Sequence, residues 1–123
     1  MAARTDFLRY VRDDVLADLY RRASAFVFLS EYEGFGLTPL EALAAGVPVI
    51  VLDTPVAREV YGDAAVFVRR DDSSAAAAAI RRFLTEPAAA QPLLARAPGV
   101  LARYSWQHAA DLTLTEIEEI ARR

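Results

Sequence analysis

The sequence contains no cysteine and a single histidine, His108. Without thiols the chain can form neither a disulfide framework nor a thiolate metal site, and one imidazole cannot hold zinc alone. Asp71 and Asp72 are adjacent acids, but they lack further carboxylates at ligand spacing and fit the start of a helix better. We therefore expect no metal site.

Long apolar segments are also absent. The opening residues 1–14 lack the apolar core of a signal peptide, and no apolar stretch approaches the roughly 20 residues that cross a bilayer. The formal net charge is −3, from 17 acidic and 14 basic side chains, and no basic run forms a stripe that would follow a phosphate backbone. These absences predict a cytoplasmic protein that does not bind nucleic acid.

What the sequence does contain fits one folded domain. Hydrophobic residues make up 54% of the 123 positions and charged residues 25%, as in soluble globular proteins. A chain of this length accommodates one core but not two, and no internal repeat or Gly/Ser linker divides it. Residues 1–123 are therefore expected to form a single domain.

The order of the apolar runs predicts the fold class. Short runs rich in Val, Phe and Ile alternate with segments of helical period, which is typical of an α/β protein with mainly parallel strands. The four expected strands are Phe7–Val11, Ala25–Leu29, Val47–Leu52 and Ala65–Val68. Together with flanking helices and a helical C-terminal region, they predict a partial Rossmann-like sheet.

Helix start signals lie between and after these strands. Asp13 and Asp14 are expected to cap a helix that runs to about Ala23. Its inward residues should be Val15, Leu16, Leu19 and Tyr20. Further helices are expected after Thr54-Pro55, from a cap at Asp71 or Ser73, from Pro87, and from Ser105, with Trp106 in the core and His108 solvated or partly packed.

The strongest helix signals flank residues 38–46. Thr38 is expected as the N-cap, Pro39 at the first helical position, and Glu41 at the third. Gly46 should end the helix in a left-handed conformation, with Pro48 soon after.

The loop from Ser30 to Thr38 links the carboxyl end of a strand to this helix. Ligands bind at that edge of an open α/β sheet, and the free N–H groups of a first helical turn favour an anion such as a diphosphate. Gly34 and Gly36 allow close backbone approach, and Thr38 adds a hydroxyl. Glu33 and, one turn into the helix, Glu41 can accept hydrogen bonds from sugar hydroxyls. The loop is therefore a candidate site for a sugar-containing diphosphate.

Each of these residues also has a purely structural alternative. Glu41 can act as a capping-box residue that bonds the N-cap amide. Gly34 and Gly36 can be ordinary turn residues, and Phe35 can anchor the loop in the core. The local sequence leaves both interpretations open.

The stretch EGFGLTPLEALAAGVPVI, Glu33–Ile50, resembles the signature of retaining glycosyltransferases of the GT-B fold, in the group also called group 1 or family 4. The similarity covers nearly the whole chain, through the segments Phe7–Val11, Asp53–Val60, Gly62-Asp63 and Tyr104–Trp106. Leu29 departs from the pattern, because the family usually has proline before the position of Ser30.

The resemblance implies the C-terminal, donor-binding half of such an enzyme. Glu33 would be the catalytic residue that binds hydroxyls of the transferred hexose, and Glu41 would bind the nucleotide ribose. The sugar and diphosphate would meet Ser30, Gly34, Phe35, Gly36, Leu37 and Thr38. No metal or other cofactor is implied; the donor would be a UDP- or GDP-hexose, with mannose the first guess.

The family also has parts that this sequence does not match: an N-terminal acceptor domain, and two earlier strands with an Arg/Lys pair that neutralises the departing phosphate. We therefore expect a donor-binding part that is inactive in isolation and works with an acceptor domain in cis or in trans, peripheral to the inner membrane face in the full-length enzyme. The alternative is a non-catalytic nucleotide-sugar-binding or interaction module. An unpaired edge at Ala25–Leu29 and the C-terminal helix predict a homo-oligomer.

Overall fold

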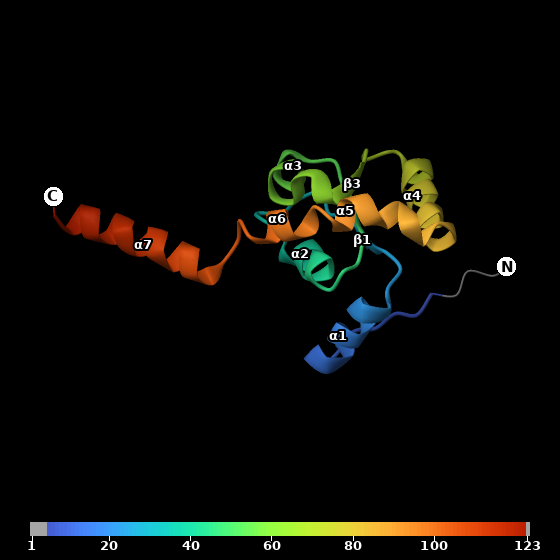
Figure 1. Cartoon of the computed structure of the whole chain (residues 1–123), viewed down its shortest axis with the longest axis horizontal. Helices are drawn as coiled ribbons and strands as arrows, with labels where there is room; N and C mark the ends of the chain where they lie inside the picture. The colour runs from blue at the N-terminus through green and yellow to red at the C-terminus, as the bar shows by residue number, and fades with distance from the viewer. Residues whose placement is uncertain (1–4, 123) are drawn as a thin grey trace.

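The computed structural model describes residues 5–122 and contains three parallel strands flanked by helices (Figure 1). The strands β1 (Phe26–Phe28), β2 (Val49–Leu52) and β3 (Ala65–Val68) lie side by side in chain order. In the central strand, Val49 is in register with Phe26 on one side and Ala65 on the other. The expected α/β class with parallel strands is confirmed.

Helices connect the strands and continue after the last one. They are α1 (Asp13–Arg22), α2 (Leu37–Ala44), α3 (Pro55–Tyr61), α4 (Ser73–Thr85), α5 (Gln91–Leu94), α6 (Ala97–Leu101) and α7 (Trp106–Ala121), with 3-10 turns η1 (Gly62–Ala64) and η2 (Pro87–Ala90).

Several helix ends follow the local signals. The Thr54 hydroxyl accepts the Ala57 N–H at 3.1 Å, and the Ser105 hydroxyl accepts the His108 N–H at 3.1 Å, so both expected starts are confirmed. The cap of α4 is Asp72, which lies between the two expected positions. Gly46, with φ of 78°, follows α2 in the expected left-handed conformation.

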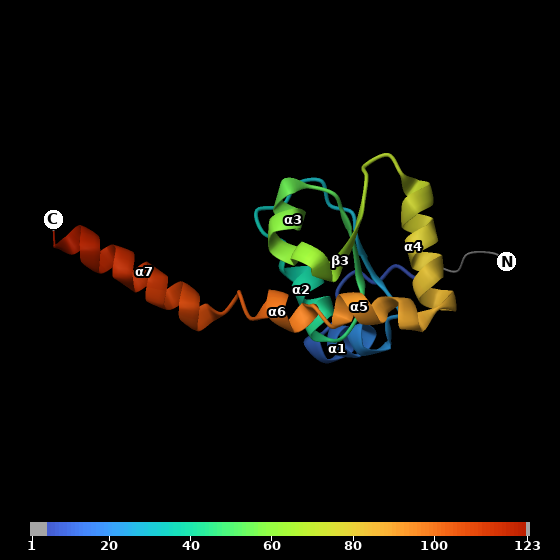
Figure 2. The ribbon, with the colours of Figure 1, turned by 45° about the horizontal axis from the view of Figure 1, so that its top comes forward.

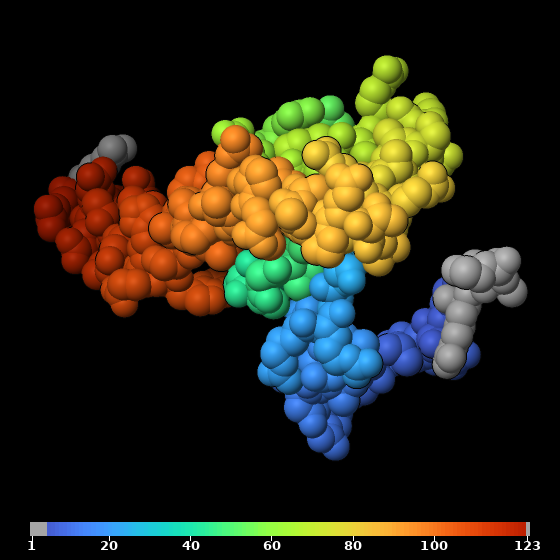
Figure 3. Space-filling view, turned by 45° about the vertical axis from the view of Figure 1, so that its right-hand side comes forward, coloured from blue at the N-terminus to red at the C-terminus, as the bar shows by residue number. Residues whose placement is uncertain are grey.

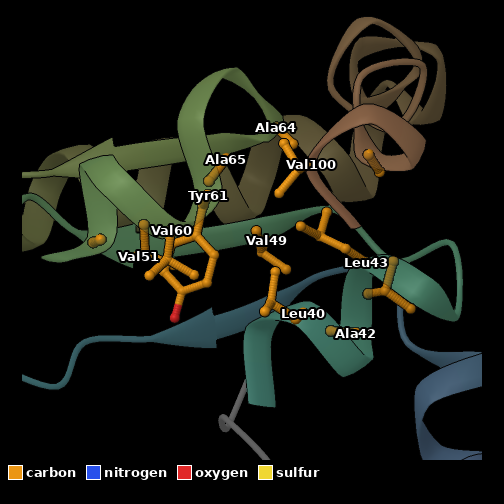
Figure 4. Packing of buried hydrophobic residues seen from close by; sticks show 13 residues of the cluster. Leu40, Ala42, Leu43, Val49, Val51, Val60, Tyr61, Ala64, Ala65 and Val100 are labelled. Carbon is orange, nitrogen blue, oxygen red and sulfur yellow. The ribbon is translucent and has the colours of Figure 1, made fainter. Parts of the chain in front are cut away.

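The sheet separates two apolar clusters because side chains alternate along each strand. Val49 and Val51 of β2 pack in the larger cluster with residues of α2, α3 and α6 (Figure 4). Ile50 packs in the second cluster, against α4 and η2. Figure 2 shows α2 and α3 on one side of β3 and α4 on the other. The four residues of β2 are all buried, as expected of a central parallel strand.

The expected first strand at Phe7–Val11 is wrong. This segment has no strand structure, and Phe7 and Tyr10 are 91% and 87% exposed. A strand forms only where a neighbour supplies hydrogen-bonding partners, and within residues 5–122 each strand pairs only with another of β1, β2 and β3. The sheet therefore has three strands and not four.

Several apolar side chains expected to be buried, on α1 and at the start of α7, are exposed. In α1, Val15, Leu16 and Leu19 are exposed, and only Tyr20 of the expected inward set packs against the larger cluster. Trp106, expected in the core, begins α7 and is 86% exposed. Figure 3 shows α1 in blue and α7 in red standing out from the body of the molecule. Both predictions were wrong because helical periodicity identifies an apolar face but not what covers it.

No helix within residues 5–122 is long and apolar enough to cross a membrane.

Candidate functional site

The candidate site lies where β1 and β2 end at the same edge of the sheet. The loop after β1 carries Ser30 and Glu33, and the chain after β2 carries Thr54. These three side chains line one depression, which is also lined by Phe28, Phe35 and Tyr61. The structure therefore joins predicted residues of the first loop to Thr54 and Tyr61, which sequence reasoning did not assign to the site.

Glu33 is exposed at this edge. Beside it is a surface hollow of about 190 Å³ that is also lined by Glu31, Tyr32 and Thr54. The pKa of Tyr61 is raised to about 12, mainly by the burial of Tyr61 and secondly by the negative charge of Glu33. Glu33 thus gives the loop an accessible hydrogen-bond acceptor that can bind hydroxyl groups.

The start of α2 differs from the expected one. Gly36 is the N-cap, with φ of 89°, and the helix begins at Leu37, so Thr38 is a helical residue and not the cap. The prediction of a Thr38 cap was wrong because a left-handed residue, which glycine adopts at little cost, lets the chain enter the helix two residues earlier. Leu37 and Thr38 are both exposed.

This helix start is suited to an anion. No side chain caps the first turn of α2, and the turn contains no acidic residue. The first N–H groups of a helix lack intrahelical acceptors and carry the positive end of the helix dipole. An anionic ligand at this position would satisfy N–H groups that no side chain within residues 5–122 caps.

Gly36 is held from beneath by Tyr61, the last residue of α3. The buried Tyr61 hydroxyl donates a hydrogen bond of 2.8 Å to the Gly36 carbonyl oxygen. A Cβ on residue 36 would overlap that hydroxyl oxygen, so the positive φ and the close contact both require glycine. Gly34 differs, because a Cβ there would meet nothing within 4 Å.

Glu41 is not a capping-box residue. It is the fifth residue of α2, beyond the reach of the Gly36 amide that a capping box would use. Its Oε2 instead accepts a hydrogen bond of 3.1 Å from the hydroxyl of Tyr20 in α1. Burial and this carboxylate together raise the pKa of Tyr20. The structure thus excludes the capping alternative and leaves an exposed, oriented carboxylate.

Phe35 is not a core anchor. It remains 36% exposed, and its ring meets Tyr104 edge-on with 5.0 Å between the ring centroids. Phe35 and Leu37 line a second, larger hollow with Trp106 and other residues at the start of α7. The loop therefore has an apolar side facing α7 and a polar side at Glu33.

Two arginines near this edge are engaged by carboxylates. Arg58 donates to both oxygens of Asp53 at 2.7 and 2.8 Å and lies over the Phe67 ring. Arg70 pairs with Glu31, with Nε donating to Oε1 at 2.8 Å. Both guanidinium charges are thus largely compensated within the protein. Among residues 5–122 no group of three His, Cys, Asp or Glu side chains is placed to hold a metal ion.

Parallel strands that open at their carboxyl ends onto a glycine-containing loop and a helix N-terminus define a Rossmann-like ligand-binding unit. The chain belongs to the glycosyl transferases of group 1, because the sequence model of that family matches residues 1–98. The resemblance seen in the sequence is thereby confirmed.

Curated relatives extend this finding. The chain is 37% identical over 105 residues to O-antigen chain mannosyltransferase RfbU of Salmonella typhimurium, an alignment that covers 85% of this chain and 29% of that protein. It is 36% identical over 108 residues to O-antigen chain mannosyltransferase B of Escherichia coli, covering 88% of this chain and 28% of the relative.

A third relative has a different named activity. The chain is 34% identical over 113 residues to D-inositol 3-phosphate glycosyltransferase of Rhodococcus opacus, covering 90% of this chain and 25% of that protein. The chain thus spans less than a third of the length of each of these three relatives.

Proposed function

We propose that this chain supplies the donor-binding half of a glycosyltransferase that moves a hexose from a nucleotide sugar to an acceptor hydroxyl with retention of configuration. The observation that carries the proposal is the start of α2 at Gly36, without a side-chain cap and between two exposed carboxylates, Glu33 and Glu41. Membership of the group 1 family supports the same conclusion.

Each part of the site has a chemical task in this proposal. Glu33 accepts hydrogen bonds from hydroxyls of the transferred hexose, and Glu41, held by Tyr20, accepts them from the ribose. The diphosphate lies against the backbone from Gly34 to Thr38, where the free N–H groups of α2 stabilise its charge. Ser30 and Phe35, which line the same depression as Glu33, border the hexose. Stabilisation of the departing diphosphate is the main catalytic requirement.

Mannose is the proposed sugar because two of the relatives described above are mannosyltransferases. The D-inositol 3-phosphate glycosyltransferase leaves other hexoses as alternatives. The first probe is therefore GDP-mannose, with UDP-glucose as the comparison.

Binding by this chain alone should be weak, and transfer should be undetectable. Arg58 and Arg70 are paired with carboxylates and do not offer free positive charge to a diphosphate. We propose that further cations and the acceptor site come from additional protein segments in cis or in trans. We expect a dissociation constant in the millimolar range for the isolated chain, which corresponds to a binding free energy of about −4 kcal/mol.

The test is ligand titration followed by amide NMR on the 123-residue chain. GDP-mannose should shift the amides of Gly36, Leu37 and Thr38. Glu33→Gln and Glu41→Gln should each weaken binding, whereas Glu116→Gln, an equivalent change on exposed α7, should not. Absence of shifts with both nucleotide sugars would contradict the proposed donor site. Transfer activity by the purified chain would contradict its proposed dependence on other segments.

A further inference from the structure

The Gly36 carbonyl has an unusual partner for an N-cap residue. In α1, α3, α4 and α7 the N-cap carbonyl accepts the backbone N–H four residues later, at distances of 2.9, 3.0, 3.2 and 3.1 Å. In α2 the corresponding carbonyl accepts the hydroxyl of Tyr61 at 2.8 Å. A side chain from another helix thus binds the peptide unit at which α2 begins.

Tyr61 is well suited to hold that peptide in one orientation. Tyr61 as a whole is 2% exposed, and its ring lies in the larger apolar cluster with Val51 and Val60, with the hydroxyl oxygen turned toward the side where β1 and α2 lie (Figure 4). The helix that carries it is fixed at its start by the Thr54 cap. With a pKa of about 12 the phenol remains a hydrogen-bond donor at neutral pH.

The orientation of one peptide group determines where the next amide points. The Gly36–Leu37 bond is trans, since residues 5–122 contain no cis peptide. In a trans peptide the C=O and the following N–H point in opposite directions. Because the Gly36 oxygen faces the buried Tyr61 ring, the Leu37 N–H faces away from the core, on the exposed side of the first turn.

We propose that Tyr61 is a positioning residue for the donor site: by binding the Gly36 carbonyl, its hydroxyl aims the Leu37 N–H at the donor diphosphate. This role rests on the donor site proposed above. Tyr61 itself does not touch the donor; it acts through a single peptide plane. Without the hydroxyl, the peptide could rotate and spend part of its time with the N–H directed elsewhere.

The experiment compares the wild-type chain with Tyr61→Phe, which keeps the ring and removes only the donor. Tyr104→Phe is the matched control, because the Tyr104 hydroxyl bonds the carbonyls of Glu59 and Val60 and not the loop. Without ligand, the ¹⁵N order parameter of Leu37 should fall in Tyr61→Phe and stay unchanged in the control. An unchanged order parameter in Tyr61→Phe would overturn the inference.

The second measurement adds GDP-mannose. Affinity should fall about three- to tenfold in Tyr61→Phe, as expected for one hydrogen bond, with the loss of shift concentrated at the Leu37 amide. Wild-type affinity and Leu37 shift in Tyr61→Phe would overturn the positioning role while leaving the donor site intact. If the wild-type chain does not bind GDP-mannose, the proposed donor site is wrong, and Tyr61 then has no donor site to position. If Tyr61→Phe gives no dispersed spectrum, Tyr61→Met, which also lacks the hydroxyl, replaces it.

Discussion

The hydroxyl of Tyr61 and the carbonyl of Gly36 are joined by a 2.8 Å hydrogen bond across 25 positions of sequence. The two residues also fit each other sterically, because a methyl group on residue 36 would occupy the space of the hydroxyl oxygen. This pair links the end of α3 to the start of α2, and so fixes the loop that carries Glu33 relative to the core.

Gly36→Ala should destabilise the protein by more than the roughly 1–2 kcal/mol that a left-handed backbone costs an L-residue. The excess comes from overlap between the new Cβ and the Tyr61 hydroxyl oxygen. The next nearest atom, Tyr61 Cζ, would be 3.5 Å from that Cβ, which is an ordinary contact. Tyr61→Phe should therefore cost less in the Gly36→Ala background than in the wild type. Urea unfolding of the double-mutant cycle measures this coupling.

The control for that cycle is Gly34→Ala, whose added Cβ meets nothing within 4 Å. It should change the free energy of unfolding by less than about 0.5 kcal/mol. Strictly additive effects of Gly36→Ala and Tyr61→Phe would contradict the proposed overlap.

Glu41→Ala should lower stability by less than about 1 kcal/mol, because it removes an exposed hydrogen bond and not a helix cap. Tyr20→Phe removes the same bond from the other side and should have a similar effect. The double variant should then cost little more than either single change, as measured by urea unfolding. A larger loss for Glu41→Ala that is independent of Tyr20 would restore the capping interpretation.

Alkaline pH should destabilise the fold through Tyr61. Burial, with smaller contributions from Glu33 and Tyr104, raises its pKa from 10.0 to about 12. Because the unfolded state releases this proton first, the stabilising contribution is complete below pH about 10 and is lost as pH rises through about 12. Thermal unfolding across this range should show a decline that is smaller in Tyr61→Phe and unchanged in Tyr10→Phe, whose side chain is exposed.

The wild-type chain should associate at high protein concentration. Within residues 5–122, β1 pairs on one side only, and Val27 of this strand is 39% exposed. Open strand edges and uncovered apolar faces, such as that of α1, favour contact with a second copy. Light scattering should show a dimer that Val27→Lys reduces, whereas Leu84→Lys, at an exposed position of α4, should not. A wild-type monomer at every concentration would refute this prediction.

The sequence by itself determined the elements whose signals are local. Thr54 and Ser105 each accept the N–H of the residue three positions later and so cap a helix. Gly46 follows α2 with a positive φ, which glycine adopts without help from distant residues. The continuous apolar run of β2 likewise predicts a central, buried strand. The family motif from Glu33 to Glu41 identified the class of protein, because its residues are contiguous in the chain.

Tertiary structure decided whatever depends on a partner distant in the chain. Within residues 5–122, Phe7–Val11 has the composition of a strand but pairs with none of the three strands, and the apolar side chain of Trp106 stays 86% exposed. Conversely, nothing near Tyr61 or Tyr20 in sequence shows that their hydroxyls bind Gly36 and Glu41. A local pattern records what a residue is able to form, whereas packing between α1, α2 and α3 selects which of those contacts exist.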